Sequence, residues 1–149
     1  MDTAFKWIKS NGLTTEDAYP YTGKGNESCQ SFNAVVFDTG FTDVESCNPD
    51  AMIAALQVGP VSIAIEADQM SFQLYKDGVL AQSKCGDQLD HGVLAVGYGH
   101  DSSSGKDYWL VKNSWGVTWG EQGYIKLERT SNSDCGTCGL LTEPSYPSV

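Results

Sequence analysis

The sequence is poor in cations and has no long apolar run. Its 149 residues include 9 Lys and Arg against 19 Asp and Glu, which gives a net charge of −10 at pH 7. Nucleic-acid binding depends on clustered Lys and Arg, so we expect no nucleic-acid partner. Because there is neither a run of about 18 apolar residues nor a basic segment followed by a short apolar one, we expect no membrane span and no signal peptide.

What the sequence has instead is apolar and turn-forming. Hydrophobic residues make up 40% of the chain and charged residues 19%, and there are 16 Gly, 4 Trp and 7 Tyr. This mixture is typical of a folded, strand-rich domain with many turns rather than of a disordered segment. The length suits one compact domain with its own core.

Apolar spacing predicts two helices in the first 60 residues. The first covers residues 1–10 and ends at Asn11-Gly12. Because it begins at the first residue with no capping residue before it, we expect further chain upstream. Residues 14–33 are expected to be loop. A second helix should start at Asn48-Pro49, where Asn caps it and Pro takes the first helical position, and stop at Gly59-Pro60.

The remaining pattern predicts strands with short connections. Alternation of apolar and polar residues from Val61 to Glu66 indicates a half-buried strand, and a short helix should hold Phe72 and Tyr75. A hairpin loop is expected from Asp101 to Gly105. Three further strands are predicted at Val93 to Tyr98, Tyr108 to Lys112 and Gly123 to Glu128.

One histidine and one asparagine stand at the ends of the two strands that the hairpin joins. Antiparallel pairing would bring the side chains of His91 and Asn113 together. The amide oxygen of Asn113 could then accept the ring N–H of His91 and fix its tautomer, leaving the other nitrogen to take a proton. Trp115 could cover that bond. A neutral amide suffices where the nucleophile is a thiol that ionises easily beside an imidazolium.

Each of these residues also has an ordinary structural interpretation. A histidine at a strand end is usually structural, an Asn before Ser is usually a turn residue, and a stretch rich in Trp and Gly is usually core plus turns. The wider sequence context has to decide between the two interpretations.

The five cysteines favour disulfides over a metal site. Cys135 and Cys138 form a lone Cys-x-x-Cys pair without His partners at zinc-site spacing, so we expect no metal. Disulfides in an oxidising compartment explain the set better. Asn26 begins an Asn-Glu-Ser glycosylation sequon, which is weakly consistent with secretion.

Several segments resemble the papain-like cysteine proteases, and the cathepsin L branch most closely. The three main segments are Leu89–Gly99 (LDHGVLAVGYG), Tyr108–Gly116 (YWLVKNSWG) and Trp119–Tyr124 (WGEQGY). Shorter matches occur at Met1–Phe5, Tyr19–Tyr21, Gly59–Val61 and Ser145–Pro147. The resemblance therefore extends over essentially the whole chain.

The resemblance implies roles for five residues. His91 is the general base and acid that pairs with the nucleophile, and Asn113 orients it. Trp115 shields their hydrogen bond, and Trp119 lines the leaving-group side of the cleft. Asp90 tunes the titration of the histidine as a nearby negative charge.

The resemblance also implies an α+β, papain-like fold without a cofactor. The chain is expected to supply mainly the family's C-terminal antiparallel, β-barrel-like domain with a few short helices. Residues 1–30 would be the fringe of the family's helical domain, and residues from about 31 to 149 the strand-rich domain.

No cysteine of the chain lies in a Gly-Ser-Cys-Trp-like context. The family's nucleophilic cysteine, and the glutamine that helps to bind the oxyanion, are therefore expected upstream. Without them neither an acyl-enzyme nor an oxyanion site can form, so the chain alone is predicted to be inactive. Because the residues that support His91 are all present, we interpret the chain as a fragment rather than as an evolved pseudoenzyme.

The family's disulfide pattern implies a bond between Cys85 and Cys138. Cys29 matches a position whose partner lies in the missing region, so we expect its thiol to be unpaired. Cys47 and Cys135 have no evident counterpart in the family, and whether they bond to each other stays open.

The resemblance places four residues around the pocket that selects the residue before the cleavage-site residue: Met1, Ala64, Leu89 and Glu143. The first three are apolar, so Leu, Phe or Val should bind there by burial. Glu143 could pair with Arg or Lys, or could be a solvated surface carboxylate. A carboxylate loses its charge around pH 4 to 5, so acceptance of Arg should weaken there while acceptance of Phe persists.

Together these features predict a cysteine-type endopeptidase that uses Cys-His-Asn chemistry. The alternatives are a non-enzymatic domain that binds peptides or a protein partner, and a chain that complements a separate N-terminal segment. The expected partners are peptide or protein substrates, a propeptide or protease inhibitors, and the missing N-terminal segment, with no nucleic acid and no membrane. A lysosomal, vacuolar or extracellular location is expected.

Overall fold

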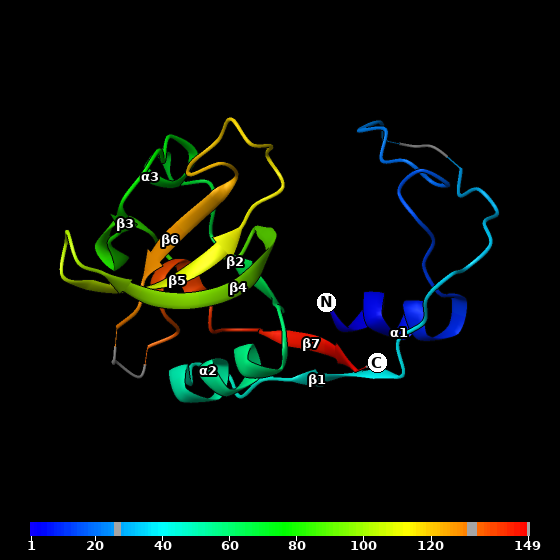
Figure 1. Cartoon of the computed structure of the whole chain (residues 1–149), viewed down its shortest axis with the longest axis horizontal. Helices are drawn as coiled ribbons and strands as arrows, with labels where there is room; N and C mark the ends of the chain where they lie inside the picture. Colours follow the sequence, from blue (N-terminus) through cyan, green and yellow to red (C-terminus); the bar gives the residue numbers. More distant parts are fainter. Residues whose placement is uncertain (26–27, 131–133, 149) are drawn as a thin grey trace. The chain divides into compact units, whose positions relative to one another are not determined.

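The computed structural model describes residues 1–25, 28–130 and 134–148 (Figure 1). The chain divides into two compact units, Met1–Thr42 with Pro147–Val149, and Asp43–Tyr146. The assignment of residues 1–30 to the fringe of another domain stays a prediction. Asn26, where the sequon begins, lies outside the described residues.

In the described part of the first unit, one helix is followed by chain that is mainly irregular up to residue 39. Helix α1 covers Asp2–Asn11 and is followed by Gly12, whose φ is 74°. It ends at the Asn11-Gly12 pair, as the sequence predicts. A side chain at Gly12 would also collide with its surroundings, because a Cβ there would lie 2.5 Å from the Cβ of Ala34. Phe5 on the helix is buried and stacks on Phe41, with 5.7 Å between the ring centroids. Glycine at position 12 thus allows both the helix end and the close approach.

Within the described residues, seven strands form one mixed sheet in the order β1-β7-β2-β4-β5-β6-β3. The strands are β1 Gly40–Asp43, β2 Val61–Ile65, β3 Val79–Leu80, β4 His91–Asp101, β5 Lys106–Lys112, β6 Tyr124–Glu128 and β7 Ser145–Ser148. Strand β3 pairs in parallel with β6, whereas β7, β2, β4, β5 and β6 pair antiparallel. The chain is α+β as predicted, but among the described residues the sheet is open and does not close into a barrel.

The other helices are short: α2 Pro49–Val58, α3 Met70–Gln73, and the 3₁₀ turns η1 Gln82–Lys84 and η2 Thr137–Gly139. Helix α2 confirms the predicted cap, since the side-chain oxygen of Asn48 accepts hydrogen bonds from the N–H groups of Asp50 and Ala51 at 3.0 Å each. In the part of the chain that the structure describes, no helix has the length and apolarity that crossing a bilayer requires.

Strands β4 and β5 form the predicted hairpin, but both begin two residues earlier than the sequence indicates. β4 starts at His91 and β5 at Lys106, and β4 also runs on to Asp101, which pairs with Lys106. In Figure 1, β4 is the long curved strand beside β2 and β5. The alternation predicted for β2 is confirmed, because every second residue from Val61 to Ile65 is buried.

The core of the second unit lies on one face of these strands. Ile63, Ala95, Val111 and Ile125 come from four neighbouring strands and are fully buried. The sequence analysis missed β1, β3 and β7, which have 4, 2 and 4 residues. Segments this short are difficult to recognise from alternation in a single sequence.

Candidate active site

Two paired strands bring His91 next to Asn113. His91 opens β4 and lies opposite Ile65 of β2. On the other side of β4, Leu94 pairs with Lys112, the last residue of β5. Asn113 follows directly, and its N–H donates to the carbonyl oxygen of Gly123 at 2.9 Å. Asn113 is therefore fixed at the end of β5, within diagonal reach of the start of β4.

The side chains of His91 and Asn113 are hydrogen-bonded. The distance between His91 Nε2 and Asn113 Oδ1 is 2.8 Å. The N–H of Ser114 donates to the same Oδ1 at 2.7 Å. Because a backbone N–H can only donate, this contact identifies the amide atom as the oxygen, and His91 Nε2 must then carry the proton. In the neutral ring Nδ1 is left as the proton acceptor.

Burial separates this bond from water on one side. Asn113 is 7% exposed, and its Nδ2 is buried without a hydrogen-bond partner among the described residues. Its oxygen alone therefore fixes the amide. The ring centroids of Trp115 and His91 are 5.1 Å apart, and the angle between the ring planes is 31°. Trp115 itself is 40% exposed, so it covers the pair at the surface of the unit.

An aromatic cluster supports Trp115 from below. The edge of Phe72 meets Trp115 at 5.6 Å between centroids, and Trp119 packs against both rings at 5.3 and 5.1 Å. Trp119 is fixed further by its indole N–H, which donates to the carbonyl oxygen of Gln73 at 3.0 Å. Aromatic pairs of this kind contribute about 0.5–1.5 kcal/mol each beyond simple burial. The cluster thus limits where the ring over His91 can move.

The loop that carries both tryptophans returns to the sheet through a tight turn. Gly120 has φ 56°, and a Cβ there would lie 2.5 Å from the carbonyl oxygen of Tyr124. Glu121 then accepts hydrogen bonds from the N–H of Gly78 at 3.0 Å and from Lys126 Nζ at 2.9 Å. Burial raises the pKa of Glu121, but the hydrogen bonds and charge of Lys126 outweigh it, so its pKa lies below the usual value. The loop is therefore anchored by a charged pair.

The side chain of Asp90, the residue before His91, is hydrogen-bonded to the backbone. Asp90 Oδ1 accepts a hydrogen bond from the N–H of Ala67 at 2.8 Å, and the N–H of Asp90 donates to Ile65 at 3.0 Å. Asp90 thus attaches the start of β4 to the end of β2. Its effect on the titration of His91 stays a prediction.

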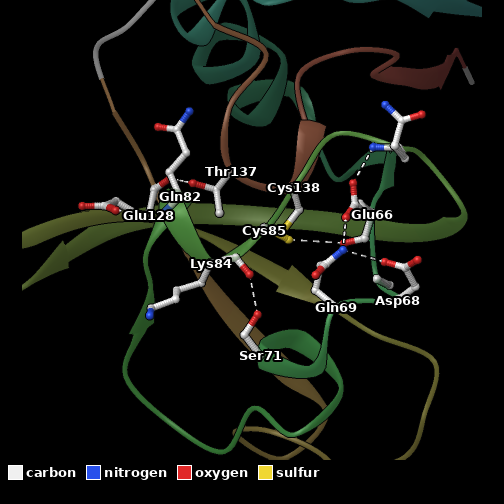
Figure 2. Close-up of a disulfide and its surroundings, with 12 residues drawn as sticks. Glu66, Asp68, Gln69, Ser71, Gln82, Lys84, Cys85, Glu128, Thr137 and Cys138 are labelled. Carbon is white, nitrogen blue, oxygen red and sulfur yellow. Dashed lines mark hydrogen bonds between the residues drawn. A yellow bond between two sulfur atoms is a disulfide. The ribbon is translucent and has the colours of Figure 1, made fainter.

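Both disulfides of the structure lie in the second unit. Cys85 is bonded to Cys138, the pair that the resemblance implies, and Figure 2 shows this bond and its surroundings. Cys47 is bonded to Cys135. The two cysteines of the Cys-x-x-Cys pair thus belong to different disulfides, so neither offers a thiolate to zinc. Cys29 is a free, exposed thiol.

The residues of the expected specificity pocket are distributed over both units. Ala64 and Leu89 are half-buried and Glu143 is exposed, all in the second unit, whereas Met1 belongs to the first. Within the described residues the carboxylate of Glu143 makes no hydrogen bond or ion pair. The pocket itself therefore stays a prediction.

The sequence analysis missed two contributors to the site. The Ser114 N–H fixes the orientation of Asn113, and Phe72 supports both tryptophans. Ser114 could have been found, because an Asx side chain at a strand end often bonds a nearby backbone N–H. The contact of Phe72 with the tryptophans depends on the fold, and no local pattern in the sequence indicates it.

A family model described as papain family cysteine protease matches residues 1–148. The chain therefore belongs to the papain family of cysteine proteases, as the resemblance predicts.

Within that family, cathepsin L-like proteins are similar to the chain. It is 53% identical over 154 residues to "Cathepsin L" of Sarcophaga peregrina, and the alignment covers 100% of this chain and 44% of the relative. The chain thus spans less than half the length of this relative and corresponds to its C-terminal portion.

Two solved structures share the papain-like fold. Bromelain from Ananas comosus, in complex with the E64 inhibitor, has a TM-score of 0.91 and 39% identity, over 99% of this chain and 68% of that one. The ragweed pollen protease Amb a 11, in its proform, has a TM-score of 0.92 and 36% identity, over 100% of this chain and 46% of that one.

Proposed function

We propose that the protein hydrolyses peptide bonds and that this chain supplies the general base, His91, and its orienting amide, Asn113. The observation that carries the proposal is the hydrogen bond from His91 Nε2 to Asn113 Oδ1, whose polarity the Ser114 N–H fixes. It leaves Nδ1 of His91 to exchange a proton with a thiol. An amide partner suits this chemistry, since the thiol ionises without the help of a carboxylate.

The proposed reaction proceeds through an acyl-enzyme. The thiol transfers its proton to Nδ1 of His91, and the thiolate attacks the carbonyl carbon of the substrate. The C–N bond breaks as protonated His91 returns that proton to the leaving amine, which leaves a thioester. His91 then deprotonates a water molecule, which attacks the thioester and releases the acid and the thiol.

The nucleophile is proposed to come from outside this chain. Four of the five cysteines are in disulfides, and Cys29 does not lie in the family's nucleophile motif. We therefore expect the thiol, and the glutamine that binds the oxyanion, to belong to a segment N-terminal to the matched region. The chain alone is then inactive.

A fusion protein tests whether the thiol comes from a segment outside this chain. The part of the Sarcophaga peregrina cathepsin L that precedes the match is joined to this chain, and hydrolysis of fluorogenic peptides is compared with that of the chain alone. We expect activity in the fusion protein only. A folded fusion protein that binds the peptides without cleaving them would instead favour a peptide-binding domain, and activity of the chain alone would contradict the proposed origin of the thiol.

Substrate choice and location follow from the same family membership. We propose that Ala64 and Leu89 receive an apolar side chain, and that Glu143 also admits Arg or Lys. We also propose a propeptide or a protease inhibitor as a partner, since the Amb a 11 structure is of the proform and the bromelain structure contains the E64 inhibitor. Two disulfides support folding in the secretory pathway, for a lysosomal, vacuolar or extracellular protein.

A further inference from the structure

Glu66 is a buried carboxylate that pairs with no cation in the part of the chain that the structure describes. It follows β2 directly and is only 3% exposed. Buried carboxylates are usually paired with a positive charge. Among the described residues Glu66 instead accepts two uncharged donors, Gln69 Nε2 on Oε1 and the N–H of Gln88 on Oε2, each at 2.5 Å. These two bonds give the Glu66 side chain a structural role in joining residues that are distant in sequence.

Glu66 joins two segments that lead into the candidate site. One is the end of β2 and the residues after it, and the other is residues 86–90, which precede His91. The second segment returns a similar bond, because Asp90 Oδ1 accepts from the N–H of Ala67 at 2.8 Å. A carboxylate of each segment therefore binds a backbone N–H of the other.

The disulfide completes this arrangement. The N–H of Glu66 donates to the carbonyl oxygen of Cys138 at 2.9 Å, and the Cys85 sulfur lies 3.4 Å from the carbonyl oxygen of Glu66. Figure 2 shows Glu66 beside Cys85 and Cys138, with its carboxylate directed away from them. The carboxylate of Glu66 also approaches Gly86 closely, so that a Cβ at residue 86 would require the Glu66 side chain to shift.

Leu89 lies between the two reciprocal bonds. Its neighbours in the chain, Gln88 and Asp90, are each held to the segment after β2. Its side chain packs against Gly139, since a Cβ on Gly139 would lie 2.9 Å from Leu89 Cδ2. The position of Leu89 is thus determined by the bonds of Glu66 and Asp90 and by the residue after Cys138.

We propose that Glu66 is a positioning residue that fixes Leu89 and thereby sets the selectivity of the pocket that Leu89 lines, without taking part in the chemistry at His91. The selectivity rests on the proposed function, whereas the fixing of Leu89 does not. His91 is positioned separately, by its pairing opposite Ile65 and by Asn113.

Two substitutions of similar length separate an acceptor from a charge. Glu66→Gln keeps an oxygen for the Gln88 N–H, and its new amide can donate to Gln69 Oε1 once the Gln69 amide turns over. Glu66→Met keeps the length but has no acceptor. Asp68→Asn is the matched control, because Asp68 is exposed and its carboxylate accepts, among the described residues, only from Gln69 Nε2.

The first measurement needs only this chain. Hydrogen exchange of the Gln88 amide and the methyl shifts of Leu89 are followed by NMR. In Glu66→Met the Gln88 amide should exchange about 10- to 100-fold faster, because it loses a bond to a charged acceptor, and the Leu89 methyl signals should move. In Glu66→Gln and Asp68→Asn we expect exchange within about threefold of the parent chain.

The second measurement uses the fusion protein and peptides with Leu or Ala before the cleavage-site residue. Glu66→Met should lower the ratio of kcat/KM for Leu over Ala about three- to tenfold, with Glu66→Gln close to the parent and an unchanged pH profile. Two results would overturn the proposal. One is an unchanged exchange rate of the Gln88 amide and unchanged Leu89 methyl shifts in Glu66→Met. The other is an equal change of these quantities in Glu66→Met and Glu66→Gln. If the fusion protein cleaves no peptide, both the proposed function and the proposed effect on selectivity are contradicted. The NMR measurement on this chain still tests whether Glu66 fixes Leu89.

Discussion

The two ends of the β4–β5 hairpin each hold a histidine bonded to a side chain across the strands, and the partners differ in charge. At one end, His91 Nε2 donates to the amide oxygen of Asn113 at 2.8 Å. At the other, His100 Nδ1 contacts a carboxylate oxygen of Asp107 at 2.8 Å, and Arg129 donates to the second oxygen at 3.0 Å. One pair of strands thus carries two imidazoles in different chemical settings.

Exposure separates the two ends as clearly as charge does. The side chains of His100 and Asp107 are 59% and 45% exposed, whereas Asn113 is 7% exposed and Trp115 covers His91. A carboxylate and a guanidinium in water form an ion-pair cluster that contributes little to stability. A buried amide orients a ring without adding a charge. The comparison agrees with the proposal that His91 transfers protons, whereas His100 is an exposed ring that contacts a carboxylate.

The largest expected effect comes from removing each imidazole in turn. In the fusion protein, His91→Ala should lower kcat/KM by about 10⁴-fold, because the general base is lost. His100→Ala should change kcat/KM by less than about twofold, since the ring is 59% exposed and lies at the other end of the hairpin. The rate of peptide hydrolysis is measured for both variants. Comparable losses of kcat/KM would contradict the distinction between the two ends of the hairpin.

Exchanging the partner of His91 tests the importance of its charge. Asn113→Ala should lower kcat about 10- to 100-fold through loss of ring orientation. Asn113→Asp makes this end resemble the His100 end. Because a carboxylate favours the protonated ring, the basic limb of the pH–rate profile should move to higher pH. An unmoved basic limb in Asn113→Asp would show that the charge of the partner has no influence.

The aromatic cover over His91 should have an intermediate effect. Trp115→Ala removes ring contacts worth about 0.5–1.5 kcal/mol, so kcat/KM should fall about two- to tenfold in the fusion protein. Tyr98→Ala is the matched control, because its ring packs on Trp109 and Arg129 near the His100 end. That control should leave kcat/KM unchanged. If the two variants lose activity equally, the aromatic cover has no specific role.

The smallest effect is expected at Asp107 and depends on pH. The hydrogen bond from His100, with a smaller contribution from the charge of Arg129, outweighs the opposing effect of burial and holds the pKa of Asp107 below its usual value. The stability it contributes should be present above about pH 3.9, the ordinary value, and be lost as pH falls through the lowered pKa. Urea unfolding of Asp107→Asn should therefore differ from the parent near neutral pH and converge with it in acid. A difference that persists in strong acid would contradict this assignment.

The sequence predicts the hairpin and its two site residues well because their signals are local. The Asn48 cap, the alternation in β2 and the Asp101 to Gly105 loop each depend on a few neighbouring residues, and the structure confirms them. The proximity of His91 and Asn113 follows from the hairpin alone. The 4-residue strands β1 and β7 and the 2-residue strand β3 were missed, because no periodicity develops over so few residues.

By itself, the amino-acid order determined the family, the fold class and which residues would meet at the end of the hairpin, since strand pairing converts sequence spacing into spatial proximity. Only the tertiary structure decided that Ser114 fixes the Asn113 amide, that Phe72 supports the tryptophans, and that Glu66 binds the Gln88 N–H. These contacts join side chains to atoms whose positions depend on the packing of several elements. No spacing rule in the sequence encodes them.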